Sequence, residues 1–174
     1  EHPLSNGNED WKTIPGIPAF QNPEIQYLYA WGFDIPVTAV KKILALPLEA
    51  LIADLELVLQ DAELRYPAYF EREEAGKEPL PLSMISFPVH AIFLLAELKS
   101  TNSLGKVCRF LGKNPEMVDY WLADHPTENL WMALFKLGKD NLERLQKFAR
   151  NQDADWRARA ATTSAVAQVA WHYS

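Results

Sequence analysis

PVHAIFLLAELKSTNSLGKVCRFLGKN, residues 88–114, aligns without a gap on PTENLWMALFKLGKDNLERLQKFARNQ, residues 126–152. Each stretch has the pattern of a helix, a tight turn and a second helix. A single helical hairpin of this kind cannot bury its own apolar face, whereas stacked hairpins share a continuous core. The two stretches therefore predict a stack of repeated helical hairpins.

The alignment matches proline with proline and apolar residues with apolar residues. The pairs are Pro88 with Pro126, Ile92 with Leu130, Phe93 with Trp131, Leu94 with Met132, Leu104 with Leu142, Val107 with Leu145 and Phe110 with Phe148. The interval of roughly 38 residues lies in the range of HEAT and armadillo repeats. We therefore expect an all-α fold, a right-handed α-α superhelix of HEAT/armadillo-like helical hairpins. Two generic helical hairpins are the alternative.

Helical spacing of apolar residues continues outside the two units. Residues 46–63 carry leucines at helical spacing with acidic residues between them, which predicts an amphipathic helix. Residues 84–98 are apolar on all sides, which predicts the most buried helix. Six prolines stand where such segments begin, because the first turn of a helix leaves its N–H donors unpaired in any case. They are Pro23, Pro36, Pro47, Pro88, Pro115 and Pro126.

The chain divides into an irregular N-terminal arm, residues 1–22, and a single all-α domain, residues 23–174. Trp11 and Phe20 are expected to anchor the arm. Residues 71–83 combine charge, glycine and proline, which predicts an exposed connection.

Residues 153–174 form an alanine-rich third unit. Small side chains allow a helix to approach its neighbour closely, and Trp156 and Trp171 are expected to fill the ends of this unit. The helical pattern reaches Ser174 without a glycine or proline to end it. We therefore expect either a further segment or a packing partner, including self-association through this C-terminal helix.

Composition limits the class of protein. A chain of 174 residues with 48% hydrophobic residues can bury one sizeable core. The net charge of −6 argues against nucleic-acid binding, which depends on clustered Lys and Arg. The single cysteine, Cys108, excludes an internal disulfide and a CxxC zinc site. No stretch has the length and apolarity of a membrane span, so we expect a cytoplasmic location and no membrane partner.

Charge is distributed unevenly along the chain. Acidic residues dominate residues 49–78, and basic residues dominate residues 136–159, which include Arg144, Lys147 and Arg150. This distribution predicts either two solvated helix faces of opposite sign or a charge-guided contact with a protein or peptide partner. For the second case, these three basic residues are binding candidates.

The best candidates for chemistry are His90, Asp124, His125 and Glu128. His90 and Glu128 stand at equivalent first-turn positions of the two units, so the side chains could converge at one edge of the stack. A histidine flanked by carboxylates can act as a general base or hold a divalent metal, which makes His90, Asp124 and Glu128 candidate catalytic residues. The alternative is local, because Asp124 or Thr127 with Glu128 could cap a helix. We assign no metal or other cofactor from this pattern.

Two further residues were weighed as site residues. Tyr120 lies beside Asp119 and Trp121 and could line a binding groove, although helix packing is the common use of such aromatic residues. Cys108 has no catalytic partner motif and is expected to be a small apolar filler.

The quoted units resemble a known family. SFPVHAIFLLAELKSTNS at 86–103 and DYWLADHPTENLWMALFKLG at 119–138 are similar to an uncharacterised bacterial domain of unknown function, and the resemblance covers about residues 40–172. That family implies a HEAT-like helical superhelix, often followed by a SEC-C zinc-binding tail. Ala123 stands where the family is expected to have glycine, and no Cys-rich tail follows Tyr173. Zinc binding therefore does not carry over, and the family has no established activity to transfer.

Together these features favour a non-enzymatic helical-repeat protein that serves as an interaction scaffold or adaptor for a protein or peptide. The alternative is a metal-assisted hydrolase or related enzyme that uses the His/Asp/Glu cluster at the repeat edge. A helical-repeat DNA repair enzyme would need a basic concave face, which the net charge of −6 argues against. A chromophore lyase of the repeat type stays open on sequence alone.

Overall fold

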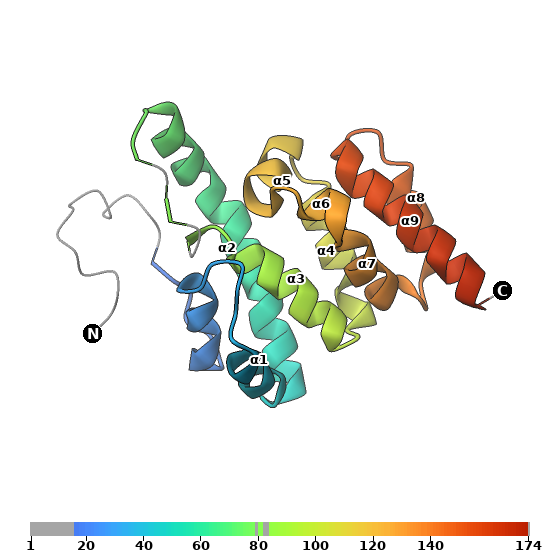
Figure 1. The fold of residues 1–174 in the computed structure, drawn as a ribbon, viewed down its shortest axis with the longest axis horizontal. Helices are drawn as coiled ribbons and strands as arrows, with labels where there is room; N and C mark the ends of the chain where they lie inside the picture. Colours follow the sequence, from blue (N-terminus) through green and yellow to red (C-terminus); the bar gives the residue numbers. More distant parts are fainter. Residues whose placement is uncertain (1–15, 79, 82–83, 174) are drawn as a thin grey trace.

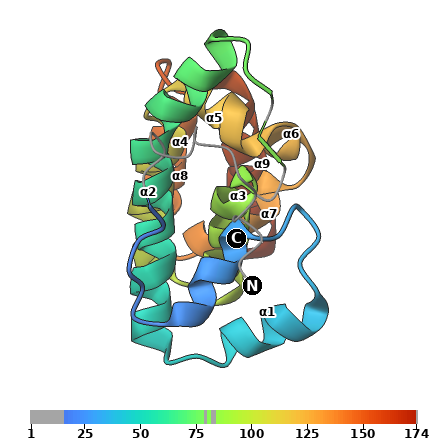
Figure 2. The ribbon, with the colours of Figure 1, turned by 90° about the vertical axis from the view of Figure 1, so that its left-hand side faces the viewer.

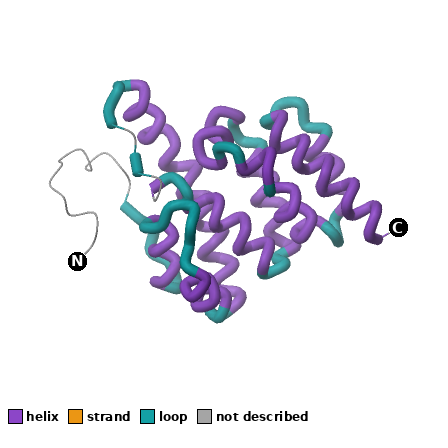
Figure 3. Tube along the Cα trace, in the orientation of Figure 1, coloured by secondary structure: helices purple, strands orange, loops and turns teal. Residues whose placement is uncertain are grey.

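The computed structural model describes residues 16–78, 80–81 and 84–173, and every regular element in this part of the chain is a helix. The elements are the 3-10 helix η2 (Pro23–Tyr29), α1 (Val37–Leu44), α2 (Leu48–Glu74), α3 (Phe87–Glu97), η4 (Thr101–Ser103), α4 (Leu104–Leu111), α5 (Pro115–Leu122), α6 (His125–Glu128), α7 (Leu130–Gly138), α8 (Leu142–Ala149) and α9 (Trp156–Tyr173). Figure 3 shows helices joined by short loops, which confirms the all-α prediction. None of the helices described is both long enough and apolar enough to cross a bilayer.

The helices form an elongated stack. Figure 1 shows α2, α3, α7 and α9 following one another across the molecule, and the view turned by 90° in Figure 2 shows α1 and η2 against the end near α2. α3 packs against both α2 and α7, and α9 packs against α7 and α8. Almost every residue of α3 is buried, from Phe87 to Ala96 with Phe93 alone half-buried, so the predicted most buried helix is confirmed.

The six prolines stand at helix starts, as predicted. Pro23 and Pro115 are the first residues of η2 and α5. Pro36 and Pro47 immediately precede α1 and α2, and the last two, Pro88 and Pro126, are the second residues of α3 and α6. A proline at these positions removes only an N–H that a helix start leaves unpaired.

The long helix α2 extends further than its sequence indicated. It continues through Pro67 to Glu74, so the first residues of the predicted connection at 71–83 are helical. Proline inside a helix normally weakens it because one backbone hydrogen bond is lost. Here Tyr66 and Tyr69 are buried on either side of Pro67, and this packing holds the helix together.

The second hairpin differs from the first in one respect. α3 is continuous, whereas the matching segment is divided by Asn129 into the short helix α6 and the helix α7. Asn129 has φ −142° and ψ −7°, outside the helical region, and its Oδ1 lies 3.1 Å from Nδ1 of His125. Asparagine bonds readily to nearby groups in non-helical conformations, which accounts for the break.

Ala123 adopts a backbone conformation that favours glycine. Its φ is 45° and its ψ is −120°, just after α5 and before Asp124. A Cβ atom is strained in this region, and glycine is the residue expected there in the resembled family.

The described part of the N-terminal arm is tied to α2. The Asp54 carboxylate accepts hydrogen bonds from the backbone N–H groups of Gln21 and Asn22, at 2.9 and 2.8 Å, and from the Asn22 side chain at 2.8 Å. Phe20 packs on the Tyr29 ring, with ring centroids 6.1 Å apart, as expected of an anchor. Trp11, the other predicted anchor, lies outside the described residues.

The C-terminal helix α9 packs through its small residues. Ala158, Ala161 and Ala165 are buried on the side facing α7 and α8, which confirms close helix approach. The prediction that Trp156 and Trp171 fill the ends of this unit is wrong, because the two side chains are 64% and 84% exposed. Helical spacing places both on the face of α9 opposite the buried alanines.

Candidate functional site

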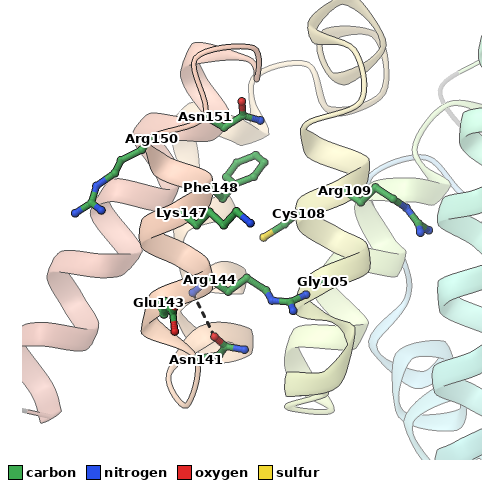
Figure 4. A pocket seen from close by; sticks show the side chains of 10 residues that line it. All are labelled: Gly105, Cys108, Arg109, Asn141, Glu143, Arg144, Lys147, Phe148, Arg150 and Asn151. Atoms are coloured by element: carbon green, nitrogen blue, oxygen red, sulfur yellow. Dashed lines mark hydrogen bonds between the residues drawn. The ribbon is translucent and has the colours of Figure 1, made fainter.

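A groove of about 850 Å³ lies between α4 and α8, the second helices of the two hairpins. Figure 4 shows the two helices facing each other, with side chains from both walls. The lining residues are Gly105, Cys108, Arg109, Asn141, Glu143, Arg144, Lys147, Phe148, Arg150 and Asn151. We call this cavity the α4/α8 groove.

Four cations and one carboxylate give the α4/α8 groove a net positive charge. Arg144 and Lys147 extend from α8 toward α4, whereas Arg150 and Arg109 point outward from the two walls (Figure 4). All four side chains are exposed, and none forms an ion pair with any residue that the structure describes. The only acidic lining residue is Glu143.

Two lysines near the groove, unlike the four cations that line it, form ion pairs with acidic residues. Lys106 binds Glu56 of α2, and Nζ of Lys113 lies 3.6 Å from a carboxylate oxygen of Glu63. The negative charge of α2 is thus partly matched by lysines of the α4 region, while no acidic residue in the described part of the chain pairs with the groove cations.

Gly105 lets Arg144 lie directly against α4. A Cβ atom at residue 105 would overlap Nη1 of Arg144 and would stand only 3.2 Å from its Cζ. Asn141 supports the same arginine from its own helix, since its Oδ1 accepts a hydrogen bond from the Arg144 backbone N–H at 3.2 Å and so caps α8. The absence of a side chain at Gly105 therefore leaves room for the Arg144 guanidinium beside α4.

Cys108 and Phe148 form the apolar base of the groove. Both are buried, at 9% and 7% exposure. Burial raises the pKa of the Cys108 thiol to about 11, although the nearby Arg144 charge lowers it. The thiol is therefore protonated at neutral pH, which fits the predicted role as an apolar filler rather than a nucleophile.

Three binding residues selected from the sequence lie together in this groove, namely Arg144, Lys147 and Arg150. Arg109, on the opposite wall, was missed. The repeat alignment contained the signal, because it places Arg109 opposite Lys147 and so sets α4 beside α8. The positive charge of residues 136–159 indicated only the α8 wall of the groove, because Arg109 belongs to α4.

Tyr120 lies at a different cavity, of about 320 Å³, lined also by Tyr69, Glu73 and Asp119. Its ring packs edge-on against Trp121, with centroids 5.0 Å apart. Burial, reinforced by the charge of Glu73, raises the pKa of Tyr120 to about 12. The structure does not bring Tyr120 to the α4/α8 groove, and its contacts are those of helix packing.

The predicted catalytic cluster is divided between buried and exposed positions. His90 is buried in α3, and its Nε2–H donates to the Gly32 carbonyl at 2.7 Å. The side chains of Asp124 and Glu128 are exposed. Nowhere in the described part of the chain do three His, Cys, Asp or Glu side chains form a group that could hold a metal ion. The structure therefore does not assemble the candidate centre of His90, Asp124 and Glu128.

His125 packs among aromatic rings instead. Its ring centroid is 5.0 Å from that of Phe33 and 6.2 Å from that of Phe93. The alternative capping role of Asp124 is also not observed, since its side chain forms no cap hydrogen bond with α6. Instead, the Thr127 hydroxyl donates to the Asp124 carbonyl at 2.8 Å.

The buried His90 predicts a pH-dependent stability. Burial lowers its pKa below the ordinary value of about 6.5, the hydrogen bond to Gly32 opposes this, and the nearby His125 lowers it further. At a pH between the lowered pKa of His90 in the folded chain and its pKa of about 6.5 in the unfolded chain, the unfolded chain binds more protons. The stability that neutral His90 contributes is therefore complete above pH 6.5 and is lost as the pH falls. We expect His90→Gln to flatten the dependence of unfolding free energy on pH between 7 and 5, measured by urea titration at each pH. Equal slopes for the native chain and the variant would contradict this.

No family model, curated protein or solved structure matches the chain. The resemblance to the bacterial domain family therefore stays a prediction, and the fold and the groove are the basis for any functional proposal.

Proposed function

We propose that the chain is a non-enzymatic helical-repeat protein whose function is to bind a protein or peptide partner in the α4/α8 groove. The observation that carries the proposal is the groove itself, about 850 Å³ in volume, with exposed cations that no described residue neutralises. Its walls are the second helices of the two hairpins, and proteins built from helical repeats commonly serve as binding surfaces.

The hydrolase alternative has weaker support. Its candidate residues are distributed between a buried histidine, His90, and two exposed carboxylates, Asp124 and Glu128. The one thiol that lines the groove, Cys108, is protonated at neutral pH because burial raises its pKa to about 11. The α4/α8 groove thus offers charge and shape for recognition but no activated nucleophile. A cytoplasmic location remains part of the proposal.

An unbiased peptide screen tests the proposed function. Immobilised native chain is used to enrich a random peptide library displayed on phage, and enriched peptides are then measured by titration calorimetry. We expect these peptides to bind the variant carrying Arg144→Ala, Lys147→Ala and Arg150→Ala at least tenfold more weakly, because the three side chains supply the positive charge of the α8 wall.

The matched control is Lys41→Ala, which removes one exposed positive charge from α1, far from the groove, and should leave affinity unchanged. The thermal unfolding midpoints of all variants should agree within about 2 °C, because exposed substitutions change stability little. Failure to enrich any peptide, or equal binding to the triple variant, would remove the proposal.

A further inference from the structure

We propose that the ligand of the α4/α8 groove is an extended acidic peptide segment with an apolar side chain between its carboxylates. This inference rests on the proposed function and names the chemistry of its partner. The two groups that it places at the centre of recognition are the Arg144 guanidinium and the Lys147 ammonium.

Charge complementarity is the first argument. Arg144 and Lys147 extend into one cavity, Arg109 and Arg150 lie at its outer edges, and among the described residues the only carboxylate in its lining is that of Glu143. The wider chain has a net charge of −6, so the positive groove is a local exception to the charge of the protein. Carboxylates on a ligand would provide the counter-charges that the described residues do not supply to Arg144 and Lys147.

The geometry of Arg144 is the second argument. An exposed arginine normally samples many rotamers, and ordering it on binding lowers affinity. Here the guanidinium lies against the open backbone of Gly105, and Asn141 caps the helix that carries it. Arg144 therefore presents a planar donor group to the groove beside Gly105, which suits a carboxylate.

The base of the groove is the third argument. Phe148 and Cys108 are buried beside Lys147 and offer a small apolar surface (Figure 4). α4 and α8 have eight residues each, or about 12 Å of helix. An extended chain advances about 3.3 Å per residue, so the groove holds about four residues of a strand-like peptide. A peptide with an apolar residue next to acidic residues would place the apolar side chain on Phe148 and Cys108 and its carboxylates near Arg144 and Lys147.

The same dimensions disfavour a nucleic acid. Binding of a duplex depends on many phosphate contacts spread along a basic surface. This basic patch is short, and α2 on the other side of α4 carries Glu56 and Glu63, which face Lys106 and Lys113. The four cations of this short patch can make only a few phosphate contacts.

A matched pair of peptides tests the ligand class. Fluorescein-labelled GEDLEDG and its amide twin GQNLQNG are titrated with the native chain and followed by fluorescence anisotropy. We expect the acidic peptide to bind at least tenfold more tightly than the amide peptide, and its affinity to fall several-fold between 50 and 500 mM NaCl because salt screens the exposed charges. Arg144→Gln with Lys147→Gln should weaken the acidic peptide at least tenfold, and Lys41→Gln should not.

Gly105→Ala tests the placement of Arg144 without removing any charge. The added methyl group displaces the end of a flexible side chain, and alanine favours a helix more than glycine does, so the unfolding midpoint should not fall. Affinity for GEDLEDG should nevertheless fall at least threefold. An unchanged affinity in a folded Gly105→Ala variant would overturn the role given to the arginine position.

The two proposals can fail separately. If the screened peptides require the groove cations but GQNLQNG binds as tightly as GEDLEDG, the binding function stands and the acidic ligand class is overturned. If neither labelled peptide binds, or the acidic peptide binds the double glutamine variant as well as the native chain, the ligand class is also overturned. If the screen itself yields no groove-dependent peptide, the proposed function is lost.

Discussion

Replacing Asp61 with alanine is expected to lower the free energy of unfolding by about 3 to 5 kcal/mol. The Asp61 carboxylate forms an ion pair with Arg65 inside α2, and both side chains are almost fully buried, at 6% and 3% exposure. It also accepts a hydrogen bond from the Tyr29 hydroxyl at 2.7 Å, and Nη2 of Arg65 donates to the Gly16 carbonyl at 2.7 Å. Removal of the carboxylate takes the Asp61 counter-charge away from a buried guanidinium, which costs more than the pair contributes when it is intact.

Two companion variants separate the buried charge from other effects. Tyr29→Phe removes one hydrogen bond to the carboxylate and should cost about 1.5 to 3 kcal/mol. Glu63→Ala, on the same helix, breaks a long ion pair with Lys113, whose side chain is 59% exposed, and should cost about 1 kcal/mol or less. Urea denaturation of the three variants gives the comparison. An Asp61→Ala cost as small as that of Glu63→Ala would show that the pair is not buried in solution.

The Asp61 pair also shows where sequence reasoning reached its limit. Acidic residues between leucines in residues 46–63 predict an exposed helix face, yet Asp54 and Asp61 are buried. Their partners come from the arm and η2, more than thirty residues earlier in the chain, such as Asn22 and Tyr29. Periodicity describes one helix at a time, so it cannot reveal that another segment covers its polar residues.

Elements that depend on local rules were predicted well. The prolines at helix starts and the apolar helix α3 follow from first-turn hydrogen bonding and from hydrophobicity on all faces. Residues whose role depends on tertiary contacts were predicted less well, such as Trp171, which is exposed, and Asn129, which divides the second hairpin.

The candidate site shows the same division. Three cations that the sequence grouped together line one wall of the groove, because the charge of residues 136–159 is a property of the sequence. Arg109 and Gly105 belong to the other wall, and only the packing of α4 beside α8 gives them their role. The supposed convergence of His90 with Glu128 assumed that equivalent first turns present side chains alike. The structure instead buries His90 against Gly32 and leaves Glu128 exposed.

Replacing Trp121 with alanine is the second substitution with a large expected effect, about 3 to 5 kcal/mol of unfolding free energy. Trp121 of α5 is 1% exposed and is among the largest fully buried side chains. Its ring packs against Tyr69 of α2 at 5.4 Å, Phe87 of α3 at 5.2 Å and Tyr120 at 5.0 Å between centroids. Alanine would leave a cavity where three helices meet, and the rigid aromatic neighbours could fill it only in part.

Trp121→Phe is the informative control for this substitution. The indole N–H of Trp121 is buried and has no hydrogen-bond acceptor among the described residues, so its loss removes a group that is already unsatisfied. Phenylalanine keeps a ring in contact with Tyr69 and Phe87, and the cost should be clearly smaller than that of alanine.

Trp171→Ala, at a side chain that is 84% exposed, should change stability by about 0.5 kcal/mol or less. If Trp121→Ala were no more costly than Trp171→Ala in urea denaturation, the packing of α5 against α2 and α3 would be refuted. Because Trp121 lies outside the lining of the α4/α8 groove, Trp121→Ala measured at a temperature where it is fully folded should bind GEDLEDG with native affinity.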